Sequence, residues 1–196
     1  MTQRRYPRNL IEPLLRTAFP ESYRIMPQRH VGSPLGTTAA DSRFATRTGG
    51  YKVLYAAPGF STAFIETIVR DRFVDRRMRE IALREITERV WVRIAAEPDA
   101  PLTLLDLRAD GCTRIGAPTD VVRGRNHASG RAFGKAIHAE HADVDGLVYS
   151  SRLTGEDVYA IFERSVEKLK AGDVGQLEEH VELPGVLERH GIELLV

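Results

Sequence analysis

Short runs of apolar residues, most of them bounded by glycine, proline or polar turn residues, are the main feature of this chain. Residues 89–94 (RVWVRI) alternate between polar and apolar positions, as a half-buried strand does. Continuous apolar runs of similar length are typical of strands that are buried on both faces. The pattern predicts strands at residues 23–25, 51–57, 89–94, 102–107, 147–149 and 158–162.

Helical patterns are fewer. Ser61 precedes four apolar residues at helical spacing, so we expect it to be the N-cap of a helix through about Val69. Residues 129–138 suggest a second helix, whose small residues would allow close packing, and a third is expected just before His190-Gly191. We expect the charged residues 71–89 to hold a helix tail and an exposed connection before the strand that begins at residue 89. The mixture indicates an α+β fold with a central sheet and few helices.

Length and composition narrow the class of protein. The 196 residues, of which 42% are hydrophobic and 28% charged, fit one globular domain with a substantial core. A net charge of +1 argues against direct nucleic-acid binding, which usually depends on a strong positive field. Cys112 is the only cysteine, so an internal disulfide and a multi-cysteine zinc site are excluded. With no apolar run of ~18 residues and a polar N-terminus, we expect a cytoplasmic protein without membrane contact.

The common motifs for nucleotide binding, metal binding and nucleophilic catalysis do not identify a function for this chain. Neither a GxGxxG loop after a strand nor a GxxxxGK[ST] loop occurs, so nucleotide binding would need another device. His138 and His141 stand three residues apart, but further ligands cannot be placed, and we expect no metal. Cys112 has no identifiable activating base and is interpreted as a packed small residue. The long turn-rich stretch 27–50 is of the kind that often carries function.

Three polar residues lie where the pattern predicts apolar ones. Arg24 lies between Tyr23 and Ile25 in a short strand, Glu66 lies on an apolar helix, and Ser151 follows a buried strand. Each also has a local explanation: Arg24 as an edge-strand charge, Glu66 as a partner of the arginine four residues on, and Ser151 as the start of a turn. Taken singly, none of them indicates a chemistry.

Their order along the chain, together with the motifs around them, resembles that of the RES domain family. The motifs are Tyr23-Arg24, Arg43-Phe44, Tyr55, Ala63-Phe64-Ile65-Glu66, Leu105-Asp106-Leu107 and Gly146-Leu147-Val148-Tyr149-Ser150-Ser151-Arg152. The family is named for an arginine, a glutamate and a serine, which fall here on Arg24, Glu66 and Ser151, and the resemblance implies that these three are the catalytic residues. The resemblance runs from about residue 23 to 162. It implies a catalytic domain at 21–170, after an N-terminal extension at 1–20 and before a peripheral segment at 171–196.

The resemblance also implies a fold and a function. RES proteins are toxins of bacterial toxin–antitoxin modules, paired with an Xre-like helix-turn-helix antitoxin. Their fold is similar to that of ADP-ribosyltransferases acting on NAD+, so we expect a single domain whose central, mostly antiparallel sheet is flanked by helices. A protein of the host cell would be one possible target of the transferred ADP-ribose.

This chain departs from the family pattern at two places. Many relatives continue after Arg43-Phe44 with Gly-Gly-Arg-Trp-Asn, whereas Ala45-Thr46-Arg47-Thr48-Gly49 keeps only the arginine. Two adjacent residues, Ser150 and Ser151, fit the position of the family's serine, and Ser151 is preferred because it precedes the arginine.

Cleavage of the nicotinamide–ribose bond passes through a positively charged ribosyl state, which a carboxylate such as Glu66 would stabilise. Without a glycine-rich loop, arginines would receive the pyrophosphate of NAD+, and flat rings would pack against its bases. Ser151 would orient the nicotinamide amide or a ribose hydroxyl, and a helix N-terminus near Ser129 would offer amides to an anion. The remaining candidates for binding NAD+ are Arg24, Arg43, Arg47, Tyr55, Asn126 and His127, with Tyr23 as a second ring.

The sequence leaves the acceptor of ADP-ribose open among a protein side chain, phosphate and water. Two other classes of function also stay open. One is a toxin ribonuclease using arginines and a histidine such as His127. The other is a non-catalytic module that binds a partner protein through residues 27–50.

Overall fold

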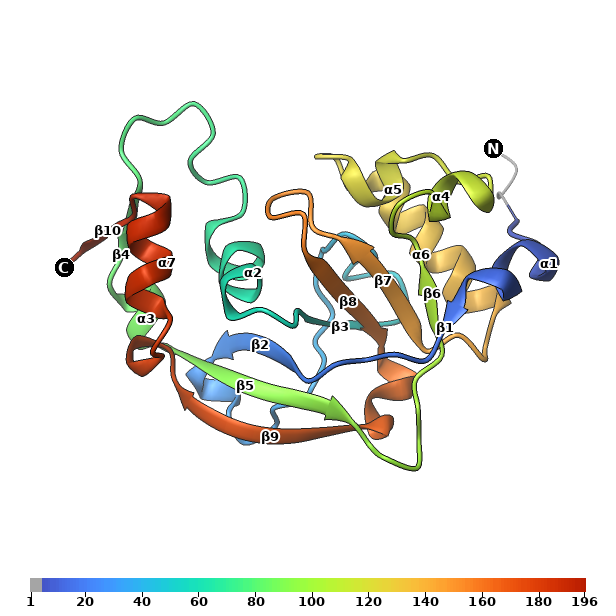
Figure 1. Ribbon diagram of the computed structural model, residues 1–196, viewed down its shortest axis with the longest axis horizontal. Helices are drawn as coiled ribbons and strands as arrows, with labels where there is room; N and C mark the ends of the chain where they lie inside the picture. The colour runs from blue at the N-terminus through green and yellow to red at the C-terminus, as the bar shows by residue number, and fades with distance from the viewer. Residues whose placement is uncertain (1–4) are drawn as a thin grey trace.

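The computed structural model, which describes residues 5–196, contains a five-stranded sheet at its centre (Figure 1). Of its neighbouring strands, β6 and β7 are parallel and the other pairs are antiparallel. β7 and β8 form a hairpin whose connection carries Ser151. The strands, in spatial order, are β1 (Leu15–Arg16), β6 (Leu104–Asp106), β7 (Gly146–Ser150), β8 (Asp157–Phe162) and β3 (Val53–Ala56).

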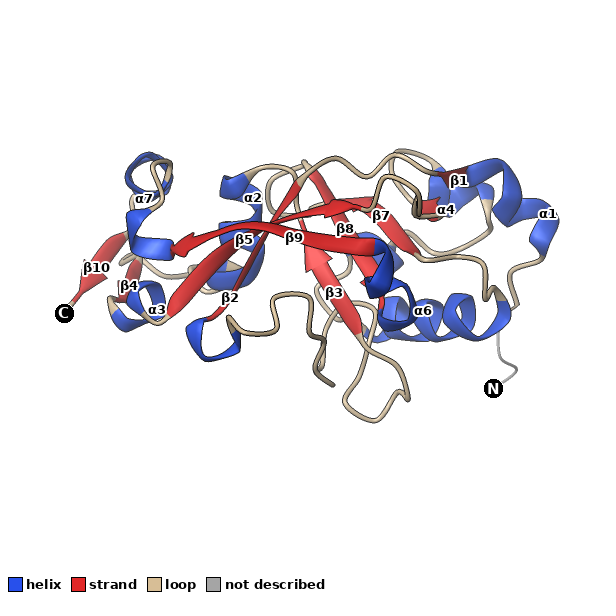
Figure 2. Ribbon diagram, turned by 90° about the horizontal axis from the view of Figure 1, so that it is seen from below, coloured by secondary structure: helices blue, strands red, loops and turns tan. Residues whose placement is uncertain are grey.

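A three-stranded antiparallel sheet crosses the first one (Figure 2) and consists of β2 (Ser22–Pro27), β5 (Arg89–Ala96) and β9 (Leu169–Gln176). Tyr23 and Ala57 join the two sheets through a pair of backbone hydrogen bonds of 2.7 and 3.0 Å. One face of each sheet contributes to a shared apolar core, in which Val92 and Ile94 pack with Leu104 and Ile161. The two sheets therefore pack face to face around one core.

The opposite face of the five-stranded sheet is covered by α6 (Ala128–Glu140), which contributes Phe133 and Ile137 to a second core cluster. Burial of these side chains against the sheet fixes the position of the helix. Shorter elements complete this layer: α1 (Arg8–Ile11), the 3₁₀ turn η1 (Glu12–Leu14), α4 (Gly111–Arg114) and α5 (Asp120–Arg123).

A third cluster fills the other face of the three-stranded sheet. There α2 (Phe60–Phe64) continues into the π-helical turn η3 (Ile65–Val69) and packs with α7 (Leu183–His190). A small parallel sheet, β4 (Glu80–Ala82) with β10 (Glu193–Leu195), lies beside α3 (Arg84–Thr87). Residues 70–79 form a loop that protrudes beside α2 (Figure 1). The remaining elements are the 3₁₀ turns η2 (Gln28–His30), η4 (Glu163–Lys168) and η5 (Leu177–Glu179).

The predicted α+β fold with a mostly antiparallel sheet core and flanking helices is confirmed. Each predicted strand overlaps an observed one, and the helices expected at 129–138 and before Gly191 are α6 and α7. Gly191 ends α7 with a left-handed φ of 58°, which glycine adopts without strain. In the described part of the chain, none of the helices is both long and apolar enough to cross a bilayer.

Other local predictions are wrong. Helix α2 starts at Phe60 with Gly59 as its N-cap, so Ser61 is not the cap. Residues 71–89 hold β4 and α3 in place of a helix tail, because the apolar side chains of Ile81 and Ile86 bury against α7 and its neighbours. The pattern missed β9, most of whose side chains are exposed, because a strand without a buried face has no apolar alternation.

Candidate active site

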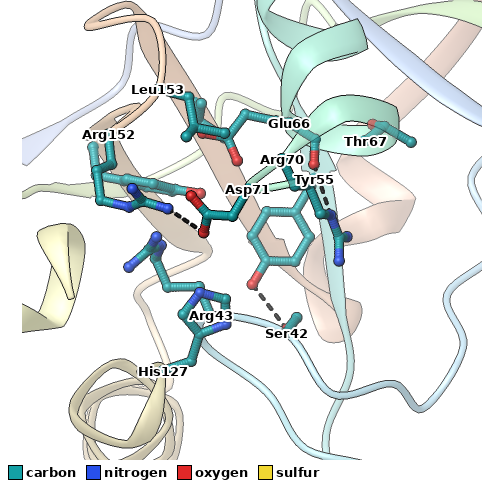
Figure 3. Close-up of a pocket in the computed structure, with 12 residues that line it drawn as sticks. Ser42, Arg43, Tyr55, Glu66, Thr67, Arg70, Asp71, His127, Arg152 and Leu153 are labelled. Carbon is teal, nitrogen blue, oxygen red and sulfur yellow. Dashed lines mark hydrogen bonds and ion pairs between the residues drawn. The ribbon is translucent and has the colours of Figure 1, made fainter. Parts of the chain in front are cut away.

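A cavity of about 150 Å³ opens where η3, the end of β7, the start of β8 and the start of α6 meet (Figure 3). It draws on five separate segments of the sequence. Its lining is Ser42, Arg43, Tyr55, Glu66, Thr67, Arg70, Asp71, His127, Tyr149, Arg152, Leu153 and Val158.

Glu66 is one of the two acidic residues that line this cavity, with Asp71 as the other. The Ser151 hydroxyl donates a hydrogen bond of 2.5 Å to Glu66 Oε1. Ser151 is only 3% exposed, and its Oγ also accepts the backbone N–H groups of Leu153 and Thr154 at 3.0 and 3.1 Å. Because the serine is fixed by the turn that it closes, it holds the carboxylate in one orientation.

The π-helical turn around Glu66 explains why the carboxylate faces the cavity. The turn ends at Arg70, whose N–H donates to the Ile65 carbonyl at 2.7 Å and whose φ is 50°, a conformation that is costly for a residue with a side chain. Arg70 Nε donates to the backbone carbonyl of Glu66 at 3.0 Å. No ion pair between the Arg70 and Glu66 side chains forms within the described structure, so the expected local pairing of Glu66 is absent. Such π-turns are frequent at functional sites.

Close packing of α6 positions Arg43 on the other side of the cavity. A Cβ on Gly130 would lie 2.5 Å from the Arg43 carbonyl oxygen, and one on Gly134 would lie 2.4 Å from that of Phe44. The prediction that small residues permit close packing of this helix is therefore confirmed. Arg43 is 8% exposed, donates to the Gly124 carbonyl at 3.0 Å, and has its guanidinium 5.9 Å from the centroid of the Tyr149 ring.

Two tyrosines form the aromatic part of the wall. The Tyr55 hydroxyl donates to Ser42 Oγ at 3.0 Å and accepts the Phe44 N–H at 3.1 Å, which ties strand β3 to the segment that carries Arg43. Burial raises the pKa of Tyr55. Burial, and to a smaller extent the nearby Tyr55 and Glu66, raises the pKa of Tyr149 well above its usual value. Both phenols are therefore neutral at physiological pH.

His127 lies at the start of α6, and arginines dominate the charges around it. Burial and then the charges of Arg43 and Arg131 lower the pKa of His127, so the imidazole is neutral at pH 7. Arg152 forms an ion pair of 2.5 Å with Asp71, whereas Arg43 and Arg70 have no carboxylate within 4.0 Å in the described part of the chain. The cavity therefore combines one oriented carboxylate with a positive wall suited to an anion.

The structure places the predicted site residues as follows. Glu66, Arg43, Tyr55 and His127 line the cavity, and Ser151 contacts it through Glu66. The buried serine is therefore Ser151, whereas Ser150 lies at the end of β7.

Four other predicted residues do not line this cavity. Arg24 donates to the carbonyls of Pro34 and Gly36 at 2.7 and 2.8 Å, so it holds the long loop and does not join Glu66 and Ser151. Burial lowers the pKa of Arg24 to about 10, which leaves it charged. Arg47 is exposed beside Asp41, and Asn126 caps the turn by accepting the Ala128 N–H. Tyr23 packs against Phe60 and Trp91 in the core.

Sequence reasoning missed several lining residues, among them Arg70, Asp71 and Arg152. Arg152 directly follows the predicted serine, and the hairpin that positions Ser151 carries it to the cavity rim. Arg70 and Asp71 follow the helix of Glu66, but a regular α-helix would have directed them elsewhere. Only the π-turn and the positive φ of Arg70 place Arg70 and Asp71 at the cavity.

The other chemical candidates have structural roles. His138 Nε2 lies 3.1 Å from Glu163 Oε1, and His141 Nε2 lies 2.8 Å from the Tyr6 carbonyl oxygen. Residues 5–196 contain no cluster of three or more histidine, cysteine or acidic side chains arranged to hold a metal. Cys112 is buried, and burial raises its pKa to about 11, which opposes a role as nucleophile.

Comparisons with known proteins agree with this architecture. "Probable toxin y4kH" of Sinorhizobium fredii (strain NBRC 101917 / NGR234) is 34% identical over 102 residues, which cover 52% of this chain and 80% of that protein. A chain in the crystal structure of the M. tuberculosis MbcT–MbcA toxin–antitoxin complex matches with a TM-score of 0.60 at 13% identity. The match covers 88% of this chain and 93% of the other, and at this identity it is a likeness of fold. The family model of the RES domain matches residues 14–183, and this protein therefore belongs to the RES domain family.

Proposed function

We propose that this protein is the toxin of a type II toxin–antitoxin system and that it consumes NAD+ in the cytoplasm. Membership of the RES domain family supports the proposal, as do a relative named as a probable toxin and a structural neighbour from a toxin–antitoxin complex. The reaction cleaves the nicotinamide–ribose bond and transfers ADP-ribose to a protein, to phosphate or to water.

The observation that carries the proposal is the Glu66 carboxylate, oriented by Ser151 inside a cavity with tyrosine and arginine walls. When the bond between C1′ and nicotinamide breaks, nicotinamide leaves with the electron pair and becomes neutral. The ribosyl group is left with a positive charge, which Glu66 stabilises. The acceptor then forms a bond to C1′ and releases a proton to solvent.

The size and lining of the cavity suit one end of a dinucleotide. Its volume of about 150 Å³ is below the ~300–1,000 Å³ usual for drug-sized ligands, so only the nicotinamide end of the dinucleotide would enter it. Tyr55 and Tyr149 offer flat partners for the nicotinamide ring. The pyrophosphate would then lie against Arg43 and Arg70, which line the cavity and have no carboxylate partner among residues 5–196.

The test is release of nicotinamide from NAD+ by the purified protein, with and without phosphate and cell lysate as sources of acceptor. We expect Glu66→Gln to reduce the rate about 10²–10³-fold, as loss of a charge-stabilising group does, while the thermal unfolding midpoint stays unchanged. Glu156→Gln is the matched control, because Glu156 is exposed on the same hairpin as Ser151 and does not line the cavity. Its rate should equal that of the wild type.

Two outcomes would contradict the proposal at different levels. Absence of nicotinamide release under all acceptor conditions would exclude an NAD+-consuming enzyme. Release that survives Glu66→Gln would place the reaction elsewhere in the molecule.

We also propose that a cognate antitoxin of the Xre-like helix-turn-helix type neutralises the protein by covering the cavity. The structural neighbour supports a protein partner, since it comes from a toxin–antitoxin complex. Addition of the antitoxin at one equivalent should abolish nicotinamide release. Binding without inhibition would show that the partner covers another surface.

A further inference from the structure

At the rim of the cavity, Asp71 and Arg152 form an ion pair that joins two separate segments. Asp71 follows the π-turn of Glu66, and Arg152 lies on the β7–β8 hairpin next to Ser151 (Figure 3). Arg152 Nη2 donates to Asp71 Oδ2 at 2.5 Å, and both side chains line the cavity. The pair therefore lies beside Glu66, the carboxylate that Ser151 orients.

The contact uses only part of what Arg152 can donate. The Nε–H of Arg152 is buried and has no hydrogen-bond partner among the described residues. Nε and Nη2 lie on the same edge of a guanidinium and form the fork that receives two oxygens of one phosphate. Asp71 engages this fork through Nη2 alone. A buried donor without a partner is uncommon in proteins and needs a reason.

The surroundings of Asp71 are those of an anion site. The hydrogen bond from Arg152, and then the charges of Arg152 and Arg125, hold the pKa of Asp71 below its usual value against the opposing effect of burial. Asp71 is thus the anion that Arg152 contacts, and Arg43 and Arg70 line the same cavity without a carboxylate of their own in the described chain.

We propose that Arg152 is a phosphate-binding residue of this cavity and that Asp71 competes with the substrate's phosphate groups for it. A phosphate oxygen takes the place of Asp71 Oδ2 on Nη2, and a second oxygen takes the Nε–H. Release of Asp71 also frees its carboxylate from the rim of a cavity that is small for a dinucleotide. The inference rests on the proposed function only for the identity of the substrate.

The inference can be tested by binding alone, using ADP as the charged probe and adenosine as the neutral one. Calorimetry would measure the Kd of both for the full chain and for Asp71→Asn. We expect Asp71→Asn to bind ADP about fivefold more tightly, which is the upper range for loss of one partly exposed ion pair, and to bind adenosine as the wild type does. The gain should shrink at high ionic strength.

Two further variants isolate the contact. Arg152→Gln should weaken ADP binding about tenfold, and in the double variant Asp71→Asn should bring no gain, because the competed group is gone. Glu85→Gln is the control: it removes one negative charge and breaks an ion pair with Arg72 near the same loop, but Glu85 does not line the cavity. It should leave both Kd values unchanged. Asp71→Ser serves as a second variant should Asp71→Asn fold poorly.

Weaker or unchanged ADP binding by folded Asp71→Asn or Asp71→Ser would overturn the inference, and so would an equal gain for adenosine. Absence of ADP binding by all variants would overturn it as well. A gain for ADP without nicotinamide release would keep the phosphate site and reject the NAD+ reaction. Nicotinamide release with no effect of Asp71 on ADP binding would reject only the competition.

Discussion

Among residues 5–196, two carboxylates accept a hydrogen bond from a serine side chain, and they have different surroundings. Asp145 receives the Ser165 hydroxyl at 2.7 Å, the Lys168 ammonium at 2.8 and 3.0 Å, and the Thr103 N–H at 2.7 Å. The Glu66 carboxylate receives the Ser151 hydroxyl and no other hydrogen bond in the described structure. Asp145 is 4% exposed, whereas Glu66 is half-buried and lines a cavity.

The difference shows how an acid in an apolar setting can have either a structural or a chemical role. The donors around Asp145 neutralise its charge and join three segments, the start of β6, the start of β7 and η4, so the group stabilises the fold. Glu66 keeps lone pairs and charge available, because its serine orients it without neutralising it. A carboxylate that the protein leaves unneutralised beside a cavity is suited to act on a bound cation.

The largest effect that separates the two sites is expected from Asp145→Ala. The change leaves Lys168, Ser165 and the Thr103 N–H without their partner, so the free energy of unfolding should fall by about 3 kcal/mol. Denaturant unfolding would measure it. The rate of nicotinamide release per folded molecule should stay that of the wild type, because Asp145 does not line the cavity. A fully stable variant with lost activity would reverse the roles assigned to the two carboxylates.

An intermediate effect is expected from Ser151→Ala, which keeps Glu66 but removes the hydroxyl that orients it. We expect kcat for nicotinamide release to fall about 30-fold, or ~2 kcal/mol, with a small change in KM. Loss of the acceptor for the Leu153 and Thr154 N–H groups should cost a further ~1 kcal/mol of unfolding free energy. Steady-state kinetics at saturating NAD+ would measure the first effect. Wild-type kcat would mean that Glu66 needs no positioning group.

The sequence predicted the strands because their buried faces show in the order of apolar residues. Strand β9 was not predicted, because its residues, LKAGDVGQ, are mostly exposed and are held by pairing with β5. The π-turn at Glu66 was also missed. It depends on a hydrogen bond from Arg70 to Ile65 that replaces the regular helical one, and no local propensity specifies it.

The candidate site was partly predictable, with a physical reason for each failure. The family motifs led to Glu66 and Ser151, which lie 85 residues apart in the chain and are in contact in the structure. Arg24 was expected to join them, but its side chain leaves β2 toward residues 34–36 and binds their carbonyls. Where the side chain of a strand residue ends depends on the loop that covers it, and a loop with this many glycines and prolines has no predictable path.

The smallest effect that tests the comparison is expected from Ser165→Ala, the counterpart of Ser151→Ala at the structural carboxylate. Asp145 would keep Lys168 and the Thr103 N–H, so loss of one hydrogen bond to this carboxylate, from a serine that is 1% exposed, should lower the free energy of unfolding by about 1.5 kcal/mol. The kinetics should not change, since Ser165 does not line the cavity. Together the two serine variants form a matched pair: the same atom is removed beside a carboxylate, and only the one at Ser151 should alter kcat. Equal loss of kcat in both variants would show that the kinetic effect of Ser151→Ala reports general loosening of the fold and not the orientation of Glu66.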